Sequence, residues 1–303
     1  MSAPLHRRPL LRRFLAALAR PLAALLHSSG LMHPQIYVRV DGGLASQIHF
    51  YLVGEEMRRR TGAEVEYDLS WFDENGMDLD GRFVRNFDLL RFSPGLPFNR
   101  ASNRWKLSLY RLLYKHINDY DAPPEDWRAL RPPLYMDGYY ADPPGFYSDM
   151  RNLFSVRPAG LDAATMVLEQ EILTAPDATG IHVRRGDLSK EVYSYGKPAS
   201  DLYFCRAVSL MQRRHGKEAP FYIFSDEPEW VRQQLLPRLP EGNYHVIDAN
   251  GSDRGYVDLW LLSRCRHFIT SKGSFGRFAA MLSSRTADMI IPDDPESRRW
   301  LPH

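Results

Sequence analysis

Two adjacent arginines stand in a segment whose residue types suit an anionic ligand. Residues 182–187 read HVRRGD and follow the apolar residues of a predicted strand. Side chains alternate along a strand, so Arg184 shares one side with His182 and Arg185 points to the other. A guanidinium donates two parallel charged hydrogen bonds to a phosphate. We expect Arg184 to face a doubly negative ligand and Arg185 to pack against a carboxylate, with Asp187 the nearest; the alternative is a surface ion-pair cluster.

Three further polar segments follow predicted strands. TSKGSF sets Gly273 and Ser274 before a predicted helix, whose free backbone N–H groups attract anions, unless Ser274 is only a helix cap. A turn through Gly43 would bring the backbone close to a ligand; it lacks the G-x-G-x-x-G pattern, so a nicotinamide cofactor is poorly supported. Asp226, in FSDE, would accept a hydrogen bond from a base or a ribose, or cap the next helix.

Strands and helices alternate along the chain and must position these residues. The pattern predicts strands over 35–40, 64–69, 134–140, 179–185, 221–226, 244–249, 267–271 and 288–293, and helices over 48–60, 106–117, 163–175, 201–216, 227–239, 256–265 and 274–283. Such alternation is typical of α/β proteins with parallel, doubly wound sheets. Ligands bind beyond the carboxyl ends of such strands. The length suits two Rossmann-like domains facing a cleft, over 34–160 and 161–303.

Composition excludes several classes of protein. The formal net charge of +2 is too small for nucleic acid to be the main partner. The two cysteines, Cys205 and Cys265, belong to no C-x-x-C pair, and H-E-x-x-H is absent. We therefore expect no disulfide scaffold, no metal cofactor and a reducing, cytoplasmic location.

Residues 1–33 form a basic amphipathic segment. They hold five arginines and no acid, and the first carboxylate of the chain is Asp41. On a helical wheel the leucines of residues 11–27 share one face, although Pro21 interrupts the helix. The apolar part is too short and broken to span a bilayer. It favours a helix lying on an anionic membrane surface, and packing on the protein body or a disordered tail are the alternatives.

Taken in order, these segments resemble the alpha-1,2-fucosyltransferase family, and more loosely other GDP-fucose-dependent transferases. HVRRGD matches the family signature His-x-Arg-Arg-x-Asp, and GGLASQ at 42–47 is similar to its first turn. Further elements in family order are DGYY at 137–140, YF at 203–204, FSD at 224–226 with Trp230, CRHFI at 265–269 and KGSFGRFAA at 272–280. The resemblance covers about residues 35–292.

The resemblance implies a GT-B-like fold, a GDP-sugar donor, a glycan acceptor and no metal. The first domain would be the acceptor side and the second would bind the donor. Arg184 would hold the β-phosphate as the catalytic residue, with Arg185 structural. The resemblance places the remaining donor contacts as follows: His182 near the ribose or phosphates, Asp226 near guanine, Ser274 and Phe275 at the phosphates, and Gly43 and Ser46 close to the sugar or diphosphate.

Two departures from the family pattern bear on the substrate. Ala45-Ser46 replaces Gly-Asn in the first turn, and Gly276-Arg277 replaces family tryptophans. The leading interpretation is an inverting transfer of L-fucose from GDP-β-L-fucose, to O2 of galactose. The alternatives are another GDP-sugar, or a degenerate non-catalytic glycan- or nucleotide-binding module. Asp41, Glu55 and Glu56 are weak candidates for the general base.

Overall fold

The computed structural model describes most of the chain. The described residues are 9–30, 32–74, 76–77, 84–116, 126–142, 146–154, 157–186, 188–190, 197–248, 250 and 253–292, with the backbone alone at 9–16, 146–149 and 190. They form two compact units. The first takes residues 1–41, 47–76 and 97–144, and the second takes 42–46, 77–96 and 145–303.

The chain therefore does not divide at a single point near residue 160. Helices α4 (Leu89–Phe92) and α6 (Phe146–Leu153) belong to the second unit. They pack against α10 (Gly255–Leu262) and α11 (Ser274–Leu282), and this packing joins them to the later part of the chain. Which unit takes the acceptor and which the donor stays a prediction.

The first unit contains a four-stranded sheet in the order β2-β1-β4-β3, all parallel. Its strands are β1 (Gln35–Arg39), β2 (Glu64–Asp68), β3 (Lys115–His116) and β4 (Leu134–Met136). Its helices are α1 (Pro9–Ser28), α2 (Leu44–Thr61), α3 (Ser70–Glu74) and α5 (Arg104–Leu113), with a 3₁₀ turn at Trp127–Ala129. The helix predicted over 106–117 is shorter than expected, because Lys115 pairs with Tyr135 of β4 as a strand.

Aromatic side chains fix a helix to each face of this sheet. Tyr37 of β1 contacts Tyr110 of α5 edge to face, with ring centroids 5.0 Å apart. Val38, the next residue, is level with Tyr67 of β2, and Tyr67 stacks on Tyr51 of α2 at 5.4 Å. Successive strand residues point to opposite faces, so α5 covers one face and α2 the other.

Helix α1 packs on α5 through Ala23 and leaves three of its leucines in solvent. Ala23 is 3% exposed and packs with Leu113 of α5. Leu18, Leu22 and Leu25 remain 63%, 60% and 63% exposed. Over the described residues, none of the helices is both long and apolar enough to cross a bilayer.

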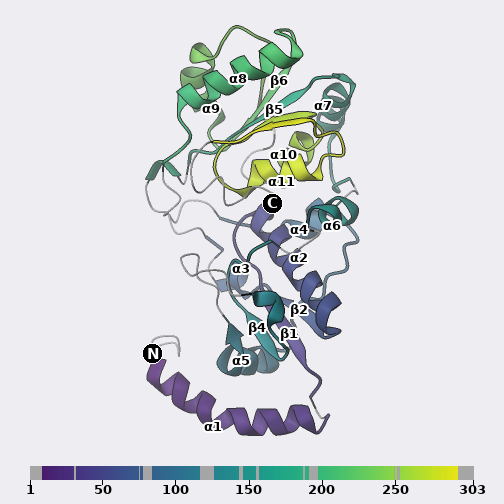
Figure 1. Cartoon of the computed structure of the whole chain (residues 1–303), viewed down its shortest axis with the longest axis vertical. Coiled ribbons are helices and arrows are strands. Elements are labelled where there is room, and N and C mark those ends of the chain that lie inside the picture. Colours follow the sequence, from purple (N-terminus) through teal and green to yellow (C-terminus); the bar gives the residue numbers. More distant parts are fainter. Residues whose placement is uncertain are drawn as a thin grey trace. The chain divides into compact units, whose positions relative to one another are not determined.

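The second unit contains a five-stranded parallel sheet in the order β7-β6-β5-β8-β9. Its strands are β5 (Thr179–Val183), β6 (Phe221–Ser225), β7 (Tyr244–Ile247), β8 (His267–Ile269) and β9 (Asp288–Ile290). Besides α4, α6, α10 and α11, its helices are α7 (Ala163–Thr174), α8 (Asp201–His215) and α9 (Pro228–Trp230). Figure 1 shows α8 and α9 on one side of this sheet and α10 and α11 on the other.

Two parallel sheets confirm the predicted α/β class. The core of the second sheet lies under α8, where Ile181, Phe204 and Ile223 are buried. The helix predicted over 227–239 is instead α9, a π-helical segment Val231–Leu235 and a 3₁₀ turn Leu236–Arg238. Pro237 has no N–H to donate to the preceding turn, so a regular helix cannot continue through it.

Candidate active site

Polar residues from three neighbouring strands of the second unit meet at one edge of its sheet. Arg184 and Arg185 follow β5, Asp226 follows β6, and Ser271 lies two residues beyond β8. Strands β6, β5 and β8 are adjacent and parallel, so their carboxyl ends share this edge. We call the group formed by His182, Arg184, Arg185, Asp226, Ser271, Ser274 and Phe275 the strand-end cluster.

Ser271 joins two of the predicted residues. Its Oγ accepts a hydrogen bond from the backbone N–H of Arg184 at 2.9 Å and lies 3.1 Å from Nδ1 of His182. The His182 ring, 8% exposed, stacks on Phe275 with centroids 5.1 Å apart. Sequence reasoning missed Ser271, because only the pairing of β5 with β8 brings it to His182.

Glycine 276 has a steric role in this arrangement. A Cβ at this position would lie 2.9 Å from Cβ of His182, closer than packed atoms come. Helix α11 can therefore approach β5 only where residue 276 has no side chain. Gly276 stands where the family pattern has a tryptophan, and it allows His182 to pack closely against α11. The neighbouring Arg277 is buried, at 4% exposure.

Arg184 lies against the beginning of α11. Its Nη1 would be 2.3 Å from a Cβ placed on Gly273, and Gly273 has φ +93°, so this position requires glycine. Gly273 is the N-cap of α11 and has no side-chain oxygen to accept from the first-turn N–H groups. A guanidinium beside a helix N-terminus provides charge and donors for an anion. Ser274 and Phe275 begin the same helix.

Arg185 and Asp226 hold the turn that carries Arg184. The guanidinium of Arg185 lies 3.5 Å above the ring of Trp230, and its Nε donates to Glu227 at 3.3 Å. The Asp226 carboxylate accepts from the backbone N–H of Arg185 and of Gly186, both at 3.0 Å. The carboxylate partner of Arg185 is therefore Glu227, and its structural role stays a prediction.

The ligand contacts predicted for the other residues of this cluster remain predictions. The Asp226 carboxylate already accepts two backbone hydrogen bonds, so a contact with guanine would be an additional role for it. Asp187 lies outside the described residues.

The same unit contains a buried carboxyl group that sequence reasoning missed. Asp258, on α10, accepts from Nδ2 of Asn250 at 2.6 Å, and Asn250 stands three residues beyond β7. Burial raises the pKa of Asp258 to about 7. The signal was present in the sequence, since Asp258 is an isolated acid in a helix whose neighbouring residues, Val257 and Leu259, are apolar.

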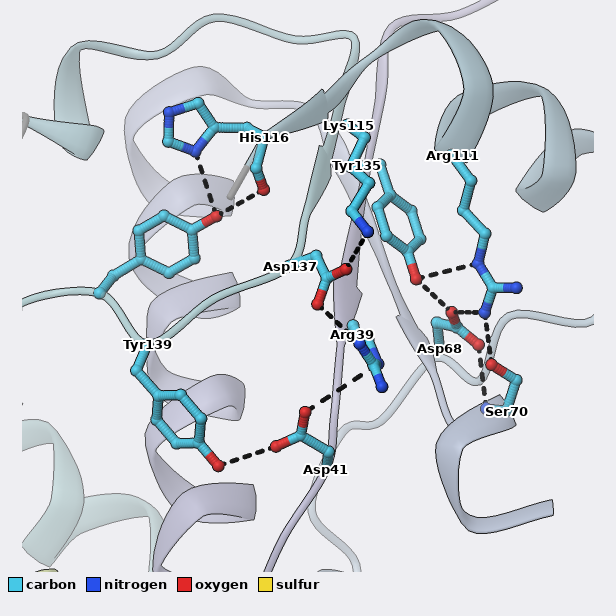
Figure 2. A network of polar contacts seen from close by, with 11 residues as sticks. Arg39, Asp41, Asp68, Ser70, Arg111, Lys115, His116, Tyr135, Asp137 and Tyr139 are labelled. Carbon is cyan, nitrogen blue, oxygen red and sulfur yellow. Dashed lines mark hydrogen bonds and ion pairs between the residues drawn. The ribbon is translucent and has the colours of Figure 1, made fainter. Parts of the chain in front are cut away.

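A second polar group lies at the carboxyl ends of the first sheet, and we call it the first-unit network (Figure 2). Asp137 accepts from Nη1 of Arg39 at 2.9 Å and from Nζ of Lys115 at 2.6 Å. Burial alone would raise the pKa of Asp137, but Lys115 and Arg39 outweigh it and hold the pKa below its usual value. Asp41 accepts from the Tyr139 hydroxyl at 2.8 Å and lies 4.0 Å from Nε of Arg39.

A buried carboxylate, Asp68 of β2, braces the same sheet. Asp68, 1% exposed, accepts from the Tyr135 hydroxyl at 2.6 Å and pairs with Arg111 of α5. Burial would raise the pKa of Asp68, but hydrogen bonds from Tyr135 and Ser70 and the charge of Arg111 bring it below its usual value. These residues tie β2, β4 and α5 together (Figure 2).

The carboxylates named as possible bases have different surroundings. Glu55 pairs with Arg58, and Glu56, 4% exposed, pairs with Arg59 and Arg60 along α2. Both therefore serve the helix itself. Asp41 alone of the three belongs to the first-unit network.

Gly43 lies in the turn between β1 and α2, and Ser46 lies at the start of α2. Gly42, with φ +70°, has the left-handed conformation. A Cβ added at Gly43 would lie 3.9 Å from the nearest atom, Nη1 of Arg85, which is an ordinary van der Waals distance. Ser46 lies half-buried in the first turn of α2. Their contact with a donor stays a prediction.

Comparison with known proteins decides the family. Residues 105–300, about two thirds of the chain, match Glycosyl transferase family 11. The chain belongs to this family. It is therefore a glycosyltransferase, and the resemblance to alpha-1,2-fucosyltransferases is confirmed at the level of the family. The first turn at 42–47 lies before the matched residues.

Individual relatives of this family 11 chain are distant. Alpha-1,2-colitosyltransferase of Escherichia coli is 22% identical over 278 residues, which cover 86% of this chain and 91% of that protein. Galactoside alpha-(1,2)-fucosyltransferase 1 of Saimiri boliviensis boliviensis is 31% identical over 121 residues, 38% of this chain and 32% of that protein. The crystal structure of fucosyltransferase NodZ from Bradyrhizobium matches at 13% identity and a TM-score of 0.50, over 83% of this chain and 94% of that one. That likeness confirms the GT-B-like fold.

Proposed function

We propose that this family 11 chain is an inverting transferase that moves L-fucose from GDP-β-L-fucose to O2 of a galactose in a glycan. Two relatives support the alpha-1,2 linkage, because both carry it in their names. The observation that carries the donor assignment is the position of Arg184, whose guanidinium lies against Gly273 at the N-terminus of α11. Arginine at a helix N-terminus suits a diphosphate.

The strand-end cluster would act on the leaving group. As the bond between C1 of the sugar and the β-phosphate oxygen breaks, its electron pair stays on that oxygen and the charge of GDP grows. Arg184 would stabilise this charge with little reorganisation, since Ser271 fixes its backbone and Gly273 leaves room for its guanidinium beside α11. One such preorganised contact is worth about 2.7–4 kcal/mol in the transition state. The transfer then needs no metal cofactor.

The first-unit network would act on the acceptor. The attacking galactose hydroxyl must lose its proton as its oxygen bonds to C1, on the face opposite the departing GDP. Asp41 is our candidate base, because it stands at the end of β1 and the Tyr139 hydroxyl fixes its orientation. Asp41→Asn should then abolish transfer to the acceptor while GDP binding persists.

A second donor has support from one observation. The relative that covers 86% of this chain is named for colitose rather than fucose. Colitose lacks one hydroxyl that fucose carries, so the two sugars differ by a single polar group in the pocket. A site that hydrogen-bonds the extra hydroxyl discriminates strongly against the sugar that lacks it.

A donor panel tests the proposal. Full-length protein is incubated with GDP-fucose, GDP-colitose, GDP-mannose or UDP-galactose, with and without lactose, and released nucleotide and product linkage are measured. We expect acceptor-dependent GDP release with GDP-fucose, an alpha-1,2 product, and no rate increase on adding Mg²⁺ or Mn²⁺. Faster release from GDP-colitose would move the assignment to colitose. GDP binding without release from any donor would favour the non-catalytic module.

We also propose that the protein works in the cytoplasm at a membrane surface, where residues 11–27 would hold it near membrane-bound glycan acceptors. The exposed leucines of α1 support this location.

A further inference from the structure

A group of histidines and carboxylates lies at the amino ends of the second sheet, opposite the strand-end cluster. His267 is the first residue of β8, Asp288 the first of β9 and His215 the last of α8, and Asp177 stands two residues before β5. Strands β5, β8 and β9 are adjacent and parallel, so their amino ends share an edge. The group has no part in the proposed transfer.

Three of these residues can direct donor atoms at one point. One ligand atom each of Asp177, His215 and His267 lies within 4.8 Å of the other two. Nε2 of His267 is 3.4 Å from Oδ1 of Asp177. Two ligands of a tetrahedral zinc ion at about 2.1 Å are about 3.4 Å apart, so this pair already has the required separation. Asp177 and His215 are only partly buried, and small side-chain rotations can close the remaining distance.

Each imidazole ring hydrogen-bonds one carboxylate, His267 through Nε2 to Asp177 at 3.4 Å and His215 through Nε2 to Asp288 at 2.7 Å. The two rings stack with centroids 3.7 Å apart. His267 is 1% exposed, and its Nδ1 is buried without a hydrogen-bond partner among the described residues. An unsatisfied buried polar atom destabilises the folded protein, so a nitrogen kept in this position calls for a reason. A bound cation would offset this cost by joining His267 to Asp177 and His215.

Charge at this edge also favours a cation. Asp177 and Asp288 bring two negative charges, and Arg214 contacts Asp288 at 3.3 Å. A divalent ion would compensate the carboxylates at the point where the ligand atoms converge.

We propose that Asp177, His215 and His267 bind one divalent transition-metal ion, with zinc the best match to a nitrogen and carboxylate ligand set. Asp288, 2.7 Å from Nε2 of His215, orients that ring, as carboxylates commonly do beside ligating histidines. The ion joins the end of α8, the segment before β5 and the start of β8. It stabilises the fold and takes no part in catalysis, because it lies at the edge away from Arg184.

Metal titration of the intact chain tests this proposal. Untagged protein is dialysed against a chelator and titrated with Zn²⁺, and its metal content and melting temperature are measured. We expect one equivalent of zinc, and at a hundredfold excess over Kd a melting temperature higher by about 5–10 °C. Co²⁺ in its place should give the visible absorption of a tetrahedral site.

Variants separate this site from adventitious binding. His215→Ala and Asp177→Asn, at partly exposed positions, should lose the zinc equivalent and the thermal shift. His245→Ala is the matched control, since His245 also lies partly exposed on this sheet, 4.0 Å from Glu171, and it should keep both. The proposal is overturned if wild type binds no stoichiometric zinc, or if His215→Ala binds it as well as His245→Ala. Dependence of GDP release on zinc below both melting temperatures would overturn the structural role.

Discussion

Arg184 and Arg185 are neighbours in the chain with different surroundings, and the same substitution at each position separates their roles. Arg184→Lys keeps the charge but loses the planar fork that binds a diphosphate. We expect turnover with GDP-fucose to fall by about 10²–10³, with the melting temperature nearly unchanged. Steady-state GDP release and thermal unfolding measure the two effects.

Arg185→Lys is the matched variant. It loses the stacking of the guanidinium on Trp230, so stability should fall by about 1 kcal/mol while turnover stays close to wild type. Equal loss of turnover in both variants would show that the two arginines are not divided between ligand and fold.

Asp258 gives the protein a pH dependence of stability. Its pKa of about 7 in the folded chain exceeds the unfolded value of about 3.9. The folded state therefore holds the proton more tightly, and the contribution of Asp258 to stability falls as the pH rises from about 4 to about 7. Asp258→Asn removes this titration, so its melting temperature should exceed that of wild type at pH 8 and approach it near pH 4.5.

Melting curves from pH 4.5 to 8 make the comparison, with Asp253→Asn, an exposed carboxylate nearby, as control. Parallel profiles for wild type and Asp258→Asn would show that Asp258 titrates normally.

At the scale of an element, α11 depends on a glycine where it meets β5. Gly276→Ala places a methyl group 2.9 Å from Cβ of His182. Overpacking costs about 1–3 kcal/mol, which exceeds the gain of about 1 kcal/mol from alanine in a helix. We expect a lower melting temperature and weaker GDP binding, measured by thermal unfolding and calorimetry.

Gly43→Ala provides the comparison, because its added methyl group would have 3.9 Å to the nearest atom. Its melting temperature should stay at the wild-type value. If Gly276→Ala is as stable as Gly43→Ala, the contact between α11 and His182 is looser than described.

Helix α1 exposes an apolar surface that can be removed without disturbing its packing. Leu18, Leu22 and Leu25 are exposed, whereas Ala23 faces Leu113. A triple serine substitution of the leucines should therefore leave the melting temperature unchanged. It should abolish co-sedimentation with anionic vesicles at low salt, since the apolar stripe drives such binding.

Deletion of residues 1–33 is a less specific test, because it also uncovers Leu113 on α5. The control is Val167→Ser with Leu202→Ser, which changes exposed apolar residues on α7 and α8. Vesicle binding by the triple variant at the wild-type level would place the membrane contact elsewhere or nowhere.

For the whole molecule, the proposed donor contacts all fall in the second unit. Hydrogen exchange with and without GDP should therefore show slower exchange in peptides that cover 179–190, 221–230 and 265–282. Peptides that cover 115–116 and 126–142 of the first unit should change little. UDP at the same concentration is the control, and we expect weaker protection from it. Strong GDP protection confined to the first unit would reverse the assignment of donor and acceptor sides.

The sequence was informative where a feature depends on neighbouring residues. The two arginines have different neighbours, as strand alternation led us to expect, and their roles stay predictions. The parallel α/β class followed from the order of elements. Strand β3 escaped prediction because Lys115 and His116 continue a helical pattern and become extended only by pairing with β4. Ser271 and the group around His267 depend on strand order, which no local pattern records.

The path of the chain between the two units has a consequence for the design of hybrid enzymes. The chain passes from one unit to the other after residues 41, 46, 76, 96 and 144. A hybrid enzyme spliced once near residue 160 would take α4 from a different parent than α10. It would replace one side of the contact between Phe92 and Trp260, and of the hydrogen bond from Arg91 to Tyr256. Exchange of the first unit of this chain therefore requires grafting at all five crossings, with residues 42–46 and 77–96 kept from the parent that supplies the second unit.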